Sequence, residues 1–139
     1  MPDDGKSLFR RFYEEVGAGN LAVIDELIAE DFVDHEEFPG LQPTREGVKQ
    51  FFAMLRSAFP DLRMEVREIL ADGDLVSARV VVTGTHEEDF MGMPSSGNHI
   101  EVQVFDMVRI RDGQVTEHWG LMDAMSIMRQ IGGMPEFPG

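Results

Sequence analysis

The hydrophobic pattern of this 139-residue chain changes at Pro60. Before Pro60, apolar residues recur every three or four positions, as in amphipathic helices. After it come runs rich in β-branched residues, separated by turn signals. Helices followed by a set of strands favour an α+β domain, with the helices packed on one face of a curved antiparallel sheet. The chain has room for one such domain over residues 1–139.

Three amphipathic helices are predicted before Pro60, over residues 7–16, 20–31 and 44–59. Asn20 and Thr44 are suited to cap the second and third helices, because their side chains accept hydrogen bonds from free backbone N–H groups. The segment between these two helices contains three proline or glycine residues and is predicted to be a loop.

Four strands and a short final helix are predicted after Pro60. The strands cover residues 63–70, 75–86, 98–111 and 114–121, the helix covers 122–131, and a turn-rich tail covers 133–139. Asp72-Gly73 and Asp112-Gly113 are hairpin signals, because both residue types tolerate the positive φ of a primed turn. The Gly-, Ser- and Met-containing segment 90–98 is predicted to be a loop at the mouth of a cavity.

The charge of the chain excludes some classes of partner. Asp and Glu number 26 against 12 Lys and Arg, which gives a formal net charge of −14. This charge repels nucleic acid and anionic membrane surfaces, so neither is expected as a partner. The acidic start does not resemble a secretory signal, which favours a cytoplasmic location. The absence of Cys excludes thiol chemistry.

The Asp112-Gly113 turn predicts which residues of the last hairpin share a face. With Arg111 opposite Gln114, paired residue numbers add to 225, and His118 points away from the cavity. A bulge in the hairpin would invert this assignment beyond it. A carboxyl group in an apolar pocket has a raised pKa, which suits it to proton transfer. The cavity face is then predicted to carry Asp106, Glu117, Trp119 and Asp123.

The stretch from Asp106 to Asp123 resembles the strand-turn-strand signature of the SnoaL-like polyketide and ester cyclases. Its E-H-W-x-x-x-D ending is fairly specific, and further matches lie at residues 58–62, 84–94 and 128–132. The resemblance implies a cone-shaped barrel of the nuclear-transport-factor-2-like type. It also implies ring closure by intramolecular aldol condensation without a metal or cofactor, with Asp123 as the acid/base residue.

Each charged candidate has a functional and a structural interpretation. Asp123 is either the catalytic base or the N-cap of the final helix. Asp106, a second catalytic candidate, and Glu117 either tune Asp123 or hold Arg79 in an ion pair. His35 is a third catalytic candidate, able to position a substrate oxygen from the predicted loop, or else a satisfied loop histidine.

The remaining candidates are predicted to bind substrate. His86 lies at the expected cavity rim, where it could orient a ligand. Trp119 either stacks on a flat substrate ring or belongs to the core. Phe59, Phe90 and Met91 complete this set. The four His residues lack the spacing of a metal motif, so no metal site is expected.

Two functions remain open at this point. The first is an enzyme of the cyclase or isomerase type that acts on a small apolar or polyketide-like molecule. The second is a non-catalytic ligand-binding or dimerisation module of the same fold. A homodimer is expected in either case, because pairing would cover an apolar sheet face.

Overall fold

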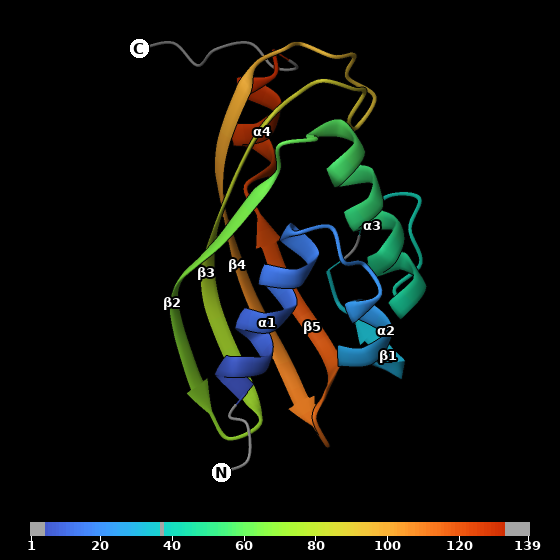
Figure 1. Ribbon diagram of the computed structural model, residues 1–139, viewed down its shortest axis with the longest axis vertical. Coiled ribbons are helices and arrows are strands. Elements are labelled where there is room, and N and C mark those ends of the chain that lie inside the picture. Colours follow the sequence, from blue (N-terminus) through green and yellow to red (C-terminus); the bar gives the residue numbers. More distant parts are fainter. Residues whose placement is uncertain (1–4, 37, 133–139) are drawn as a thin grey trace.

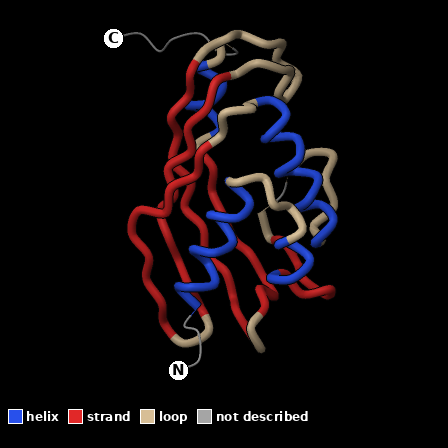
Figure 2. The backbone as a smooth tube through the Cα atoms, in the orientation of Figure 1, coloured by secondary structure: helices blue, strands red, loops and turns tan. Residues whose placement is uncertain are grey.

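The computed structural model describes residues 5–36 and 38–132. Helices α1 (Gly5–Gly17), α2 (Val23–Leu27) and α3 (Arg45–Ala58) lie on one side of a curved sheet, and α4 (Ala124–Gln130) follows the last strand (Figures 1 and 2). The α+β class, the three N-terminal helices and the short final helix are therefore confirmed. Among the described residues, no helix combines the length and apolar character needed to cross a membrane.

The sheet has five strands in the order β1-β5-β4-β3-β2. They are β1 (Ile28–Asp34), β2 (Arg63–Asp72), β3 (Leu75–Thr85), β4 (His99–Arg111) and β5 (Gln114–Met122). β1 pairs with β5 in parallel, and the other pairs are antiparallel. The sheet is thus mixed and open at both edges, in contrast to the predicted antiparallel barrel.

Strand β1 is the largest departure from the predicted elements. The second helix ends at Leu27, and Ile28–Asp34 forms a strand where the sequence predicted helix and then loop. Buried apolar residues at positions 24, 27 and 28 suit a helix, but Ile28 is already paired with Val115 of β5. Hydrogen bonding to the edge of β5 therefore overrides the local helical pattern.

The four later strands agree with the predicted ranges to within two residues. Asp112 and Gly113 form the predicted turn, with φ of 52° and 75°. In the other hairpin Asp72 pairs with Leu75, so the turn residues are Gly73 and Asp74, one position later than predicted.

The β4–β5 hairpin contains a bulge that changes which residues face the helices. Ile110 pairs with Val115 as predicted, but Arg109 pairs with Glu117, which leaves Thr116 as an extra residue. Paired numbers then add to 226, as for Val108 and His118. The predicted facing of β5 is therefore wrong beyond the bulge: His118 lies on the inner face, and Glu117 on the outer face.

Apolar faces of α1 and α3 pack toward the inner face of the sheet. Phe9 and Val16 of α1 and Leu55 of α3 are almost fully buried. Burial of each such side chain contributes roughly 1.5–3 kcal/mol to stability. Thr44 caps α3 as predicted, because its Oγ1 accepts a hydrogen bond from the Gly47 N–H at 3.3 Å.

Candidate active site

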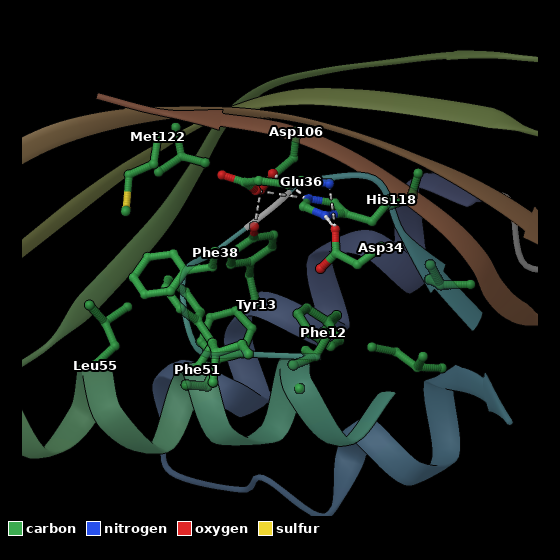
Figure 3. A pocket seen from close by; sticks show the side chains of 18 of the residues that line it. Phe12, Tyr13, Asp34, Glu36, Phe38, Phe51, Leu55, Asp106, His118 and Met122 are labelled. Atoms are coloured by element: carbon green, nitrogen blue, oxygen red, sulfur yellow. Dashed lines mark hydrogen bonds and ion pairs between the residues drawn. The ribbon is translucent and has the colours of Figure 1, made fainter. Parts of the chain in front are cut away.

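A cavity of about 760 Å³ lies between α1, α3 and the inner face of the sheet. Most of its lining is apolar. The phenylalanines in the lining are Phe9, Phe12, Phe32, Phe38, Phe51 and Phe52. Five polar side chains meet at the sheet side of the cavity and are called here the polar cluster: Tyr13, Asp34, Glu36, Asp106 and His118 (Figure 3). The cavity therefore combines a large apolar volume with one localised group of titratable residues.

His118 lies at the centre of the polar cluster, on β5. Its Nδ1 is 2.8 Å from Asp34 Oδ1 and its Nε2 is 2.7 Å from Asp106 Oδ1. Burial acts to lower the pKa of His118, but the hydrogen bonds to Asp106 and Asp34 and the charges of these carboxylates outweigh it and raise the pKa to about 10. At neutral pH His118 is therefore an imidazolium that donates both of its N–H groups.

Asp106 is almost fully buried, with 3% of its surface exposed. Oδ1 accepts the hydrogen bond from His118, and Oδ2 accepts one from the Tyr13 hydroxyl. Burial, followed by the negative charge of Asp106, raises the pKa of Tyr13 well above its ordinary value, so the phenol remains a donor. Asp106 thus lies in the cavity, with both carboxylate oxygens hydrogen-bonded.

Asp34 and Glu36 reach the cluster from the end of β1. Asp34 Oδ1 accepts both the His118 hydrogen bond and the Glu36 backbone N–H, the latter at 3.0 Å. Glu36 Oε1 is 3.9 Å from His118 Nε2. Burial is the largest cause of a raised Glu36 pKa; the His118 charge opposes it, while the Asp106 and Asp34 charges add to it. Glu36 is therefore a carboxyl group disposed to hold a proton.

Gly120 provides the space for these carboxylates. It is opposite Asp106 in the β4–β5 ladder and lies on the inner face. A Cβ at this position would lie 2.5 Å from both Asp106 Oδ1 and Glu36 Oε1, and 2.8 Å from His118 Cε1. Any other residue at position 120 would displace the cluster.

Glu36, Asp106 and His118 each offer one potential metal-ligand atom, and these atoms lie within 4.8 Å of one another. His118 Nε2 carries the proton that it donates to Asp106, so a cation would have to displace that proton. The hydrogen bonds instead fit a group of residues that share protons.

The structure places Asp123 outside the cavity, as the N-cap of α4. Its side chain is exposed and accepts hydrogen bonds from Ser126 N at 3.1 Å and Ser126 Oγ at 2.6 Å. The Ser126 side-chain and backbone hydrogen bonds lower the Asp123 pKa. The predicted raised pKa is therefore wrong: β5 ends at Met122, so Asp123 leaves the sheet and satisfies the helix N-terminus.

Four further candidates have their side chains on the outer face of the sheet. His35 borders the cavity, but its Nε2 is 2.8 Å from Glu117 and its ring stacks on Trp119 at 4.8 Å. Arg79 pairs with Glu68 at 2.7 and 3.0 Å rather than with a carboxylate of the cavity. The bulge accounts for the outward positions of Glu117 and Trp119.

The rim candidates form a packed unit away from the cavity lining. His86 is fully buried; its Nδ1 accepts the Ser96 N–H, and its ring is 5.5 Å from that of Phe59. Phe90 packs on Phe59 at 5.3 Å, whereas Met91 is 40% exposed. The loop that contains these residues closes on itself by pairing Phe90 with Met93.

Sequence reasoning placed only Asp106 of the five polar-cluster residues in the cavity: Tyr13, Asp34 and Glu36 were not site candidates, and His118 was assigned to the opposite face. Asp34 ends β1, and Glu36 follows it in a bend, where the Glu36 backbone N–H donates to Asp34 Oδ1. The sequence predicted helix and then loop for this stretch, so it gave no sign that Asp34 pairs with β5. Tyr13 belongs to the predicted helical stripe, and nothing in the sequence separates it from the core aromatics.

The comparisons with known proteins place this chain in a family and agree with its fold. The model of the SnoaL-like polyketide cyclase family matches residues 7–131. Aklanonic acid methyl ester cyclase DnrD of Streptomyces peucetius is 27% identical over 132 residues, covering 90% of this chain and 88% of the relative. Nogalonic acid methyl ester cyclase of Streptomyces nogalater is 26% identical over 111 residues, covering 78% and 83%.

Solved structures give the same result. Wild-type IdmH from Streptomyces antibioticus superimposes with a TM-score of 0.82 at 34% identity, covering 94% of this chain and 99% of that one. The matched family model, the curated relatives and this structural neighbour all extend over most of the chain. The chain therefore belongs to the SnoaL-like polyketide cyclase family.

Proposed function

We propose that this protein is a cyclase that closes a carbon ring in a polyketide-type ester by acid/base chemistry. The observation that carries the proposal is the polar cluster at one side of an otherwise apolar cavity. An apolar, partly enclosed surround strengthens electrostatic interactions and excludes competing water. Proton transfer to and from carbon next to a carbonyl needs such an environment.

In the proposed reaction, a carboxylate of the cluster removes a proton from the carbon next to a substrate carbonyl. The imidazolium of His118 stabilises the negative charge of the resulting enolate, because it remains protonated at neutral pH. The enolate carbon then attacks a second carbonyl of the same molecule, forming the carbon–carbon bond. The new alkoxide takes the proton back, so the substrate is isomerised and the cluster returns to its starting state.

The lining and the charge of the cavity favour a neutral aromatic substrate. Six phenylalanines border the cavity and offer flat surfaces to a fused-ring molecule. The cluster contains three carboxyl groups but only one cationic side chain, His118. A free carboxylic acid would ionise and be repelled, whereas its ester would not. The two relatives named for methyl ester substrates support this choice.

Incubation with aklanonic acid methyl ester and with nogalonic acid methyl ester tests the proposal. Cyclised product is measured by chromatography with mass detection and NMR. We expect turnover by the wild type and a loss of at least about 100-fold in Asp106→Asn, which removes a negative charge next to His118. The matched control is Asp123→Asn, which alters a carboxylate outside the cavity and should turn over like the wild type.

A non-catalytic ligand-binding module is the alternative. Asp123 serves as a helix cap, which this alternative predicts, but the cavity is open rather than filled by Phe and Met side chains. Tight binding of the esters by the wild type without product, measured by calorimetry, would favour the binding module. Equal turnover by wild type and Asp106→Asn would contradict acid/base chemistry at the cluster.

We also propose that the outer face of the sheet pairs with a second copy of this chain. Phe105 and Leu121 are directly opposite each other in the β4–β5 ladder and are 55% and 79% exposed. Pairing would remove this apolar surface from water. Sedimentation velocity should show a dimer that weakens in Leu121→Asp, and a wild type that stays monomeric at high concentration would contradict the pairing.

A further inference from the structure

We propose that Glu36 is the residue that exchanges the proton with the substrate, while the other members of the polar cluster keep their protonation states unchanged. This assignment rests on the proposed function and identifies which carboxylate performs it. It follows from the hydrogen bonds of each member of the cluster and from the position of Glu36 in the cavity (Figure 3).

His118 is not available as a base. Both ring nitrogens carry protons and are committed, Nδ1 to Asp34 at 2.8 Å and Nε2 to Asp106 at 2.7 Å. An imidazolium in this arrangement has no lone pair for a substrate proton. Its part is to keep a positive charge at the centre of the cluster.

Both carboxylate oxygens of Asp106, and Oδ1 of Asp34, are occupied by hydrogen bonds within the cluster. Each Asp106 oxygen accepts a hydrogen bond, one from His118 and one from Tyr13, and the residue is 97% buried, since only 3% of its surface is exposed. Asp34 Oδ1 accepts both from His118 and from the Glu36 backbone. Protonation of either aspartate would break an ion pair with the imidazolium.

Glu36 differs from both aspartates in its contacts. Its side chain is 27% exposed and borders the cavity, so a ligand there can reach it. Its Oε1 is 3.9 Å from His118 Nε2, beyond hydrogen-bond distance but close enough to feel the positive charge. The absence of a side chain at Gly120 leaves room for this carboxyl group, whose Oε1 lies 2.5 Å from the place of a Cβ.

Burial is the largest contribution to the Glu36 pKa and raises it, which favours the protonated form. The charged groups that face it are His118 from β5, which acts to lower the pKa, and Asp106 from β4 and Asp34 from β1, which act to raise it. The backbone N–H of Met122 donates to Glu36 and also acts to lower the pKa, and Tyr13 of α1 lies close enough for the Glu36 charge to raise the Tyr13 pKa. One imidazolium between two ionised aspartates already leaves a net negative charge, so Glu36 is the carboxyl group whose ionisation adds a second one. A general base works best when its pKa lies near the operating pH.

Glu36 alone can carry out both proton transfers of the ring closure. The ionised carboxylate takes the proton from the substrate carbon, so that a C–H bond breaks and an O–H bond forms on Glu36. The electron pair left on carbon forms the new carbon–carbon bond to the second carbonyl, whose oxygen becomes an alkoxide. Glu36 then returns its proton to that oxygen, and no oxidant or further reactant is needed.

The test compares Glu36→Gln and Glu36→Asp with the wild type, on the methyl ester that the wild type turns over. The matched control is Glu30→Gln, an exposed glutamate of β1, the strand that precedes Glu36. We expect Glu36→Gln to lose about 100-fold or more in kcat with KM changed by less than about 3-fold, and to lose the acid limb of the pH profile. Glu36→Asp should keep part of the activity and shift that limb, and Glu30→Gln should match the wild type.

The unfolding free energy of Glu36→Gln, compared with that of the wild type, shows whether the variant folds. A carboxyl group with a raised pKa in the folded state loses stability as the pH rises from its ordinary value through the raised one. Removal of that charge should therefore leave Glu36→Gln at least as stable as the wild type at pH 7 and flatten the pH dependence of stability below it. A positioning role alone would not move the pH profile of kcat.

The outcomes separate this inference from the proposed function. Ester turnover by the wild type that survives unchanged in Glu36→Gln overturns the inference and leaves the proposed function standing. If the wild type turns over no ester, the proposed function fails, and a carboxyl NMR titration of Glu36 then decides the assignment. A Glu36 signal that titrates at or below the ordinary range overturns it, and one that titrates above that range supports Glu36 as the proton acceptor.

Discussion

The imidazolium of His118 predicts a specific pH dependence of stability. Its pKa rises from 6.5 to about 10 on folding. Below pH 6.5 both the folded and the unfolded chain carry the proton, so the ion pairs with Asp34 and Asp106 contribute in full. As the pH rises through the folded value near 10, the folded chain also loses the proton, and that contribution disappears.

The magnitude follows from the span between the two pKa values. Each pH unit in this window is worth about 1.4 kcal/mol, so the span from 6.5 to about 10 gives an upper limit of about 5 kcal/mol. Water entry and rearrangement of the half-buried Glu36 relieve part of the loss. We therefore expect a decrease of about 2–4 kcal/mol in the unfolding free energy.

Urea unfolding of the wild type and of His118→Gln at pH 6.5, 7.5, 8.5 and 9.5 measures this contribution. The difference between the two curves isolates His118 from the other histidines and the chain terminus. The difference should be largest at pH 6.5 and should decrease toward pH 10. Curves that remain parallel across the range would refute the buried imidazolium.

Three substitutions give further tests. Tyr13→Phe removes the hydroxyl donor of Asp106 and should cost about 1–3 kcal/mol in urea unfolding; an unchanged midpoint would contradict that contact. Gly120→Ala places a Cβ 2.5 Å from the carboxylates of Asp106 and Glu36, so we expect a loss of about 1–3 kcal/mol and of cyclase turnover, and a variant with normal kinetics would show that the cluster is loosely held. Asp123→Ala removes a helix cap and should cost about 0.5–2 kcal/mol with turnover unchanged, whereas lost turnover at normal stability would restore Asp123 as a site residue.

Local patterns in the sequence were enough for most of the elements. The helical stripe of residues 7–16, the cap at Thr44 and the Asp112-Gly113 turn all form where predicted. Each of these features depends on neighbours within a few positions, so the local sequence is enough to predict it. Asp106 was also placed in the cavity correctly. The extra residue of the bulge lies on β5, so the alternation of side chains along β4 is the same with or without it.

Residues on β5 could not be assigned in the same way. A hairpin register counted from its turn holds only while both strands advance together, and the extra residue Thr116 exchanges the two faces beyond it. His118 thereby enters the cavity, and Glu117 and Trp119 leave it. No local pattern predicts the bulge, because Thr116 suits a regular strand equally well.

Local sequence signals were thus sufficient for the α+β class, the order of most elements, the family resemblance and the acidic charge that disfavours nucleic acid. Which titratable residues meet depends on the three-dimensional fold. β1 forms because the edge of β5 accepts it, which overrides a helical pattern, and this pairing places Asp34 beside His118. Tyr13 then reaches Asp106 from 93 positions away in the chain. A charge cluster in a cavity depends on which strands pair and on which face of each strand a side chain lies. Both are set by contacts between distant parts of the chain, which short-range sequence signals do not contain.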